Sequence, residues 1–191
     1  MKVEKVDRRV ARTQKQLQAA LISLMLEQGY EQCTVQHILD RAEVSRSTFY
    51  AHFSDKEALF VSSIANLRAG LTQQWRADLD SGTVKGQLGF VRPFLAHVDG
   101  SHHVWRAFVK GESGRIMDRE FRQMLTSMAK RDLGVSKSSP PAHHIAVACV
   151  VGALMSLVET WMARESRSSA AEMNELFLRI TLPGLQELMA G

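Results

Sequence analysis

Apolar side chains near the N-terminus recur at the spacing of a single helix face. They are Leu17, Leu21, Leu24 and Met25. Spacings of three and four residues predict an amphipathic helix from Asp7 to Gln28. Gly29 follows directly, and a glycine at that place commonly ends a helix.

Thr34 begins a second, shorter helical pattern. Threonine is a favoured N-cap because its hydroxyl accepts a hydrogen bond from a free backbone N–H of the first turn. The apolar residues that follow at helical spacing are Val35, Ile38, Leu39 and Ala42. They predict a two-turn helix with one buried face.

Two further helix-start signals follow at Ser45 and Ser54. Ser45 is suited to cap a helix over residues 46–52. Ser54 and Glu57 have the spacing of a capping box, which predicts a long helix from there to Asp80. Two short helices joined by a tight turn, set between longer helices, are the arrangement of a helix-turn-helix.

The rest of the chain is also predicted to be helical. Residues 136–141 are rich in Ser and Pro, which indicates a loop, and alternating β-branched residues are scarce. Five more helices are expected, over residues 84–97, 102–110, 116–133, 142–164 and 171–189. The predicted fold class is therefore all-α, with about nine helices.

The positive charge of the chain is concentrated at its N-terminus. Of 191 residues, 24 are basic and 20 are acidic, for a net charge of +4. Residues 1–16 contain six basic and two acidic residues, so the basic and acidic residues elsewhere cancel. A basic segment on an otherwise neutral chain suggests a polyanionic partner. A solvated basic helix face is the plain alternative.

Composition narrows the class of protein. With 45% hydrophobic residues the chain can bury a sizeable core, and no apolar run is expected to span a bilayer. Residues 1–12 are charged, unlike a secretory signal. Cys33 and Cys149 are too few and too far apart for a disulfide framework or a zinc site. We therefore expect a cytoplasmic protein with no membrane partner.

The predicted third helix carries the side chains that a DNA recognition helix needs. Arg46, Ser47 and Thr48 lie in its first turn, where contacts to base edges normally occur. Arginine can donate two hydrogen bonds to guanine, and Ser or Thr can reach bases. Phe49 and Phe53, four residues apart, are expected to face inward and hold the helix in place.

The residues around this helix resemble the N-terminal region of the TetR family of transcriptional regulators. The similarity covers roughly residues 9–60, and it is carried by residues 29–38, GYEQCTVQHI, and above all by residues 48–59, TFYAHFSDKEAL. The resemblance implies a homodimer that binds double-stranded operator DNA. It also implies a C-terminal helical domain that dimerises and senses a small-molecule effector.

The resemblance further implies roles for individual residues. The base-reading positions are Gln36, Arg46, Ser47 and Thr48. The phosphate-contacting positions are Thr34, Tyr50, His52 and Lys56. The residues that match a variable arm, which in some members enters the minor groove, are Arg8, Arg9 and Arg12.

Glu43 departs from the family pattern, because a glycine is usual in this turn between the second and third helices. A left-handed backbone there costs a residue with a Cβ atom on the order of 1 kcal/mol. The carboxylate also places a negative charge near the phosphates. This departure motivates an alternative in which DNA binding is weakened, and it leaves the predicted fold unchanged.

The last two predicted helices resemble the dimer interface of the family. Their apolar residues recur at helical spacing, and small residues beside them permit close helix approach. The predicted interface residues are Val150, Leu154, Leu157, Trp161, Phe177 and Ile180. The alternative is that this stripe faces the domain's own core.

The middle helices are rich in aromatic residues and methionine, a mixture that occurs in apolar ligand cavities. The predicted pocket residues, chosen because they sit near mid-helix, are Trp75, Phe94, Trp105, Phe121 and Met155. For each of them an ordinary place in the core is the alternative. The implied ligand is of moderate size and is aromatic or apolar.

Enzymatic chemistry has little support in the sequence. No Gly-rich phosphate loop, nucleophile elbow or paired metal motif occurs. Adjacent histidines, such as His102 and His103, point to different helix faces and make poor metal chelators. We expect no catalytic residue, no metal and no cofactor, with a small helical enzyme as a remote alternative.

The predicted function is a TetR-type transcriptional repressor. A DNA-binding domain over residues 1–54 would bind a palindromic operator as a dimer. A ligand-binding and dimerisation domain over residues 55–191 would release it when a small-molecule effector binds. The alternative, which Glu43 motivates, is a dimer of the same fold that acts through a protein partner and binds DNA weakly.

Overall fold

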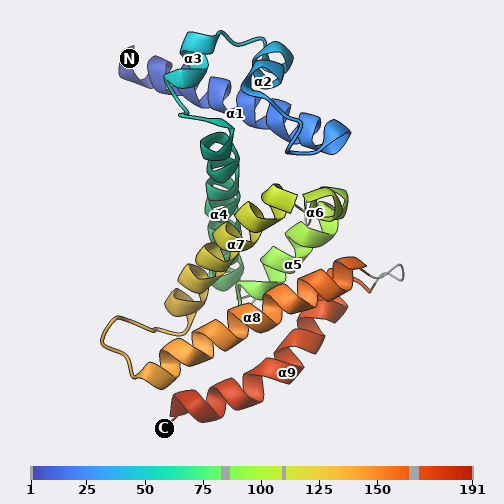
Figure 1. Ribbon diagram of the computed structural model, residues 1–191. Coiled ribbons are helices and arrows are strands. Elements are labelled where there is room, and N and C mark those ends of the chain that lie inside the picture. Colours follow the sequence, from blue (N-terminus) through green and yellow to red (C-terminus); the bar gives the residue numbers. More distant parts are fainter. Residues whose placement is uncertain (1, 83–86, 109–110, 164–167, 191) are drawn as a thin grey trace. The chain divides into compact units, whose positions relative to one another are not determined.

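The computed structural model describes residues 2–82, 87–108, 111–163 and 168–190. Within these ranges the chain forms helices and no strand (Figure 1). The helices are α1 (Lys2–Gln28), α2 (Val35–Ala42), α3 (Arg46–Tyr50), α4 (Lys56–Asp80), α5 (Val91–Gly100), α6 (His102–Phe108), α7 (Gly111–Asp132), α8 (Pro141–Ala163) and α9 (Ala170–Ala190). The all-α fold class is confirmed.

The chain divides into two compact units. The head unit contains residues 1–66 and 107–117, and the body unit contains residues 67–106 and 118–191. Helices α4 and α7 contribute residues to both units. The head unit therefore contains the predicted helix-turn-helix, the first part of α4 and the first turns of α7.

Burial in the head unit follows the predicted apolar stripes. Helices α1 and α2 pack against each other, and α2 also contacts α3. Gly29 follows α1 with a φ of +82°, a left-handed conformation that glycine adopts without strain. The buried residues of α1 and α2 include Leu17, Leu21, Leu24, Met25, Ile38 and Leu39.

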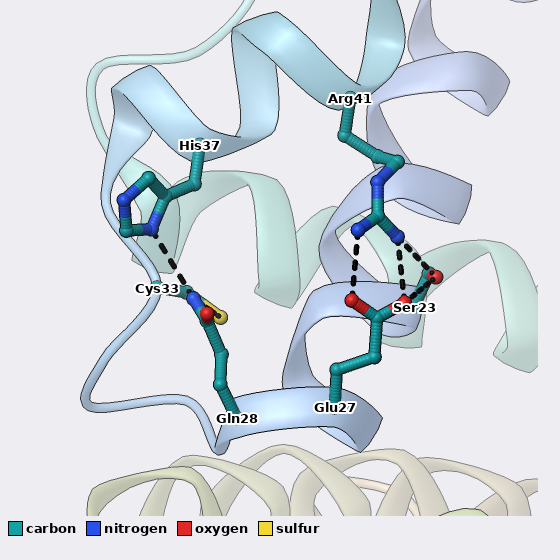
Figure 2. Close-up of polar contacts among 6 residues, drawn as sticks. All are labelled: Ser23, Glu27, Gln28, Cys33, His37 and Arg41. Carbon is teal, nitrogen blue, oxygen red and sulfur yellow. Dashed lines mark hydrogen bonds and ion pairs between the residues drawn. The ribbon is translucent and has the colours of Figure 1, made fainter.

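Polar side chains fix α2 against the end of α1 (Figure 2). The guanidinium of Arg41 donates to both carboxylate oxygens of Glu27 at 2.7 Å and to Ser23 Oγ at 2.8 Å. Near the start of α2, Gln28 Nε2 donates to Nδ1 of His37 at 3.2 Å. The hydrogen bonds from Arg41 and then from Ser23 lower the pKa of Glu27 from 4.5 to about 2.

The first two predicted helix caps are confirmed, and the third lies one residue later than predicted. Thr34 Oγ1 and Ser45 Oγ each accept a hydrogen bond from the N–H three residues on, at 3.1 and 3.3 Å. Helix α4 is capped by Asp55 instead of Ser54, since Asp55 Oδ1 accepts from the N–H of Ala58 at 2.7 Å. A carboxylate is favoured over a hydroxyl at the positive end of a helix because it carries negative charge.

The largest error in a predicted boundary concerns the helix expected over residues 84–97. Helix α5 begins at Val91, after a turn over residues 87–90, and residues 84–86 lie outside the described ranges. The carboxylate of Asp132, at the end of α7, accepts a hydrogen bond from the N–H of Leu88. Leu88 itself has a φ of +64°. A contact from a distant segment thus holds this stretch as a turn.

Helix α8 is strongly apolar and lies alongside α9 within the body unit (Figure 1). It is 23 residues long and contains an 18-residue stretch with a mean hydropathy of 1.9, so it is long and apolar enough to cross a membrane. The expectation that no segment meets this test was therefore wrong. Half of this apolar stretch is buried within the protein. The core helix of a globular domain can be equally long and apolar.

Glu43 occupies the turn between α2 and α3 in a left-handed conformation, with a φ of +54° and a ψ of +42°. Its backbone N–H and that of Val44 both donate to the carbonyl oxygen of Leu39. These hydrogen bonds close the last turn of α2 and direct the chain toward α3. The positive φ expected at this position is confirmed.

We predict that Glu43→Gly stabilises the protein. Relief of the left-handed strain outweighs the added flexibility of the unfolded chain, so the free energy of unfolding rises by up to about 1 kcal/mol. Urea unfolding followed by circular dichroism measures the change. Glu43→Gln removes the charge but keeps the Cβ atom, and it should leave stability unchanged. Equal stabilisation by both variants would attribute the effect to charge and not to backbone strain.

We also predict an acid-dependent contribution from Arg41. The folded-state pKa of Glu27 is depressed to about 2, so the contact stabilises the fold above the unfolded value of 4.5 and is lost as the pH falls toward 2. Arg41→Ala should therefore be less stable than the parent protein at neutral pH, and the difference should shrink below pH 4.5. Urea unfolding at a series of pH values between 7 and 2 measures this difference. Arg92→Ala, at an exposed arginine, is the control for the loss of a positive charge. A difference that stays constant with pH would contradict the prediction.

Candidate nucleic-acid interface

Helix α3 presents a polar surface and buries an aromatic one. Arg46 and Ser47 are exposed and Thr48 is half-buried. Phe49 is fully buried, and Phe53, just beyond the helix, is 8% exposed. Their ring centroids lie 6.0 Å apart. The two phenylalanines predicted to face inward are confirmed as anchors of α3.

Side-chain hydrogen bonds organise the first turn of α3. Ser45 Oγ lies 2.8 Å from Thr48 Oγ1 and 3.1 Å from Ser47 Oγ. Arg46 Nη2 donates to Gln36 Oε1 at 3.5 Å, which links α3 to α2. Of the predicted base-reading residues, Arg46 and Gln36 therefore contact each other, and Ser47 and Thr48 share Ser45 as a partner.

The predicted phosphate-contacting residues differ in how freely they are presented. Thr34 is exposed, His52 is half-buried, and Tyr50 is 50% exposed. Lys56 Nζ instead donates to the carbonyl oxygen of Tyr30 at 2.9 Å and lies 4.1 Å from the centroid of that ring. The ammonium of Lys56 is therefore held by the protein, and only its remaining N–H donors are available to a phosphate.

Arg8, Arg9 and Arg12 are exposed residues of α1, not of an extended arm. Arg8, Arg12 and Lys15 follow one another at spacings of four and three residues, so they share one face of α1. A helix about 10 Å across does not fit a minor groove about 6 Å wide. In this structure the three arginines therefore form part of a helix face, and their contact with DNA stays a prediction.

The predicted pocket residues are all buried in the body unit, but the structure brings only three of them into ring contact. The centroid of Phe121 lies 4.6 Å from that of Trp105 and 6.0 Å from that of Phe94. Trp75 packs instead on Phe90, with the centroids 6.2 Å apart. The buried Nε1–H of Trp75 has no hydrogen-bond partner among the described residues.

Most of the predicted interface residues are buried within the body unit itself. Val150, Leu154, Trp161 and Phe177 are at most 6% exposed in the single chain, so they have little area to offer a second copy. Leu157 is half-buried, and Ile180 is 67% exposed.

The sequence predicted an apolar stripe on the last helix that includes Leu188, but it did not single out Ile145. Ile145 of α8 is 61% exposed and Leu188 of α9 is 38% exposed. They line an apolar groove of about 260 Å³ between α8 and α9, together with Cys149. The exposed position of Ile145 was hidden because α8 is apolar on nearly all sides.

Residues 17–62 match the family described as "Bacterial regulatory proteins, tetR family". The chain is similar to the HTH-type transcriptional regulator TcmR of Streptomyces glaucescens, with 33% identity over 110 residues, which are 51% of this chain and 47% of TcmR. The chain spans less than half the length of the curated relatives that it matches.

Solved structures share the fold over nearly the whole chain. A TetR transcriptional regulator from Streptococcus agalactiae 2603V aligns with a TM-score of 0.69 and 20% identity, over 94% of this chain and 98% of that one. FadR of Thermus thermophilus, a TetR-family repressor in complex with lauroyl-CoA, aligns with a TM-score of 0.59 and 19% identity, over 90% of this chain and 94% of that one. The helix-turn-helix of this chain is thus similar to that of the TetR family of bacterial regulatory proteins, and the chain shares the fold of these solved structures.

Proposed function

We propose that this protein regulates transcription in the cytoplasm by binding a palindromic DNA operator as a dimer. The observation that carries the proposal is the polar, exposed first turn of α3 above the buried Phe49. A short helix fixed in this way can enter a major groove with Arg46, Ser47 and Thr48 toward the base edges. Gln36, held beside Arg46, is proposed to read an adjacent base.

Contacts to the DNA backbone are proposed to surround this helix. Tyr50 and His52 lie just after the base-reading turn, and Thr34 stands at the N-terminus of α2. A helix N-terminus attracts phosphate because its free N–H groups and dipole favour negative charge. The basic face of α1, with Arg8, Arg9 and Arg12, adds a contribution that should weaken as salt rises.

The dimer is proposed to form through the exposed faces of α8 and α9. Ile145, Ile180 and Leu188 are large apolar side chains exposed in the single chain, and the groove between the helices is itself apolar. Exposed apolar surface of this kind is typical of a protein–protein contact. A two-fold dimer presents two α3 helices and so matches a palindromic operator.

We further propose that the protein acts as a repressor and that an apolar effector in the body unit releases the DNA. The aromatic contacts of Phe94, Trp105 and Phe121 and the buried Met155 would receive the apolar part of the effector. The unpartnered N–H of Trp75 would be satisfied by an acceptor on the ligand, since leaving a buried donor unpaired costs about 1–3 kcal/mol. Lauroyl-CoA, the ligand in the FadR structure, is a first probe of this class.

We predict that Arg46→Ala weakens binding to the operator by about 1–3 kcal/mol, because one arginine–guanine contact is worth about that much. Gel shifts and footprinting on the DNA upstream of the protein's own gene identify the site and measure the affinity. Arg92→Ala, which removes an exposed arginine of α5, is the matched control and should retain wild-type affinity. Ligands with an apolar chain, lauroyl-CoA among them, are then added to the wild-type complex to test release.

Absence of sequence-specific binding by the wild-type protein would reject the proposal. Specific binding that survives Arg46→Ala combined with Tyr50→Ala would show that α3 does not read the DNA. Either result would favour the alternative of a dimer that acts through a protein partner. The exposed charge of Glu43 at the edge of α3 is the feature that motivates that alternative.

We predict that Ile145→Glu combined with Ile180→Glu separates the dimer. Burying an isoleucine is worth about 1.5–3 kcal/mol, so the dissociation constant should rise roughly a hundredfold or more. Sedimentation velocity at several protein concentrations measures it. Leu26→Glu, at a 40%-exposed leucine of α1, is the control and should remain dimeric. An unchanged dimer in the double variant would place the interface elsewhere.

A further inference from the structure

The loop between α1 and α2 holds the start of a helix that lies far along the chain. Glu31 Oε1 accepts a hydrogen bond at 2.8 Å from the backbone N–H of Glu112, the second residue of α7. Both residues belong to the head unit. The N–H groups of a first helical turn have no partner within the helix, and a carboxylate there also meets the positive end of the helix dipole. Glu31 therefore caps α7 from outside it.

Gly111 makes this close approach possible. A Cβ atom at this position would lie 2.3 Å from Glu31 Oε1, and the residue has a φ of +71°. Any other side chain would displace the carboxylate and strain the backbone. The hydrogen bond from Glu112 is also the largest cause of the lowered pKa of Glu31, so the carboxylate is charged at neutral pH.

The loop between α1 and α2 also contacts the start of α4. Lys56, the first residue of α4, donates to the carbonyl oxygen of Tyr30 and lies over its ring. Helices α4 and α7 both continue into the body unit. The two helices shared between the units are thus held at consecutive residues, Tyr30 and Glu31. Three residues later, Thr34 caps α2.

We propose that Glu31 is a positioning residue that couples α7 to the helix-turn-helix. This inference rests on the proposed function, because it supplies a route by which the effector would act on the head. Helix α7 also carries Phe121, one of the candidate effector residues, and it runs as one helix from Gly111 to Asp132. A displacement of α7 beside the effector is carried to its capped first turn, and from there to the loop that precedes α2.

Amide hydrogen exchange of the full-length protein tests the cap without DNA or effector. In Glu31→Ala the amide of Glu112 should exchange roughly fivefold faster, the usual effect of losing a helix cap. Gln32→Ala, at the neighbouring exposed position, should exchange like the wild type. Glu31→Gln keeps an acceptor and should lie between them. Unchanged exchange in Glu31→Ala would overturn the proposal, provided circular dichroism shows an intact fold.

The coupling between the head unit and the body unit is tested by the tryptophan fluorescence of the body unit. All three tryptophans, Trp75, Trp105 and Trp161, belong to the body unit, so their fluorescence reports unfolding of the body. Operator DNA, which binds the head, should raise the denaturation midpoint of this signal in the wild type and in Gln32→Ala. In Glu31→Ala we expect DNA to raise this midpoint by roughly half as much or less. The variant loses the contact of Glu31 with α7 and keeps only that of Tyr30 with α4.

The outcomes separate this inference from the proposed function. Faster exchange at Glu112 with an undiminished DNA-induced shift would leave Glu31 a local cap and overturn its role in coupling. If the wild type binds no DNA, the proposed function fails and the role in coupling fails with it. The exchange result would still decide whether Glu31 caps α7.

Discussion

A five-residue helix has no stability of its own in water, so the orientation of α3 depends on the burial of Phe49. Phe49 is fully buried, and truncating such a side chain costs about 3–5 kcal/mol. Phe53 and the Ser45 cap add to the same constraint. The exposed positions of Arg46 and Ser47 follow from it, because a helix that buries one face must present the other.

The sequence predicted the head well because its signals are local. Caps at Thr34 and Ser45 and apolar spacings within one helix depend only on near neighbours, and each is present in the structure. The α4 cap falls on Asp55, one residue after the predicted Ser54. Local patterns of this kind state which side chains face inward before any tertiary contact is known.

The features that the sequence did not predict depend on contacts between distant segments. Asp132 holds the turn at Leu88 from 44 residues away, and Lys56 turns toward Tyr30 over a separation of 26 residues. Helical spacing grouped Val150, Leu154 and Trp161 correctly on one face, but spacing does not say whether that face meets the same chain or another. Their burial in the body unit shows that it meets the same chain.

The packing that fixes α3 also limits how an effector can act on it. Every anchor of α3, from Phe49 to the Ser45 cap, lies inside the head unit. Rearranging α3 within the head would expose the buried phenylalanine, at a cost of about 1.5–3 kcal/mol in lost apolar burial alone. Displacing the head as a whole leaves these contacts intact. In the proposed dimer, a displacement transmitted to Tyr30 and Glu31 should therefore change the distance between the two α3 helices and not the shape of either one.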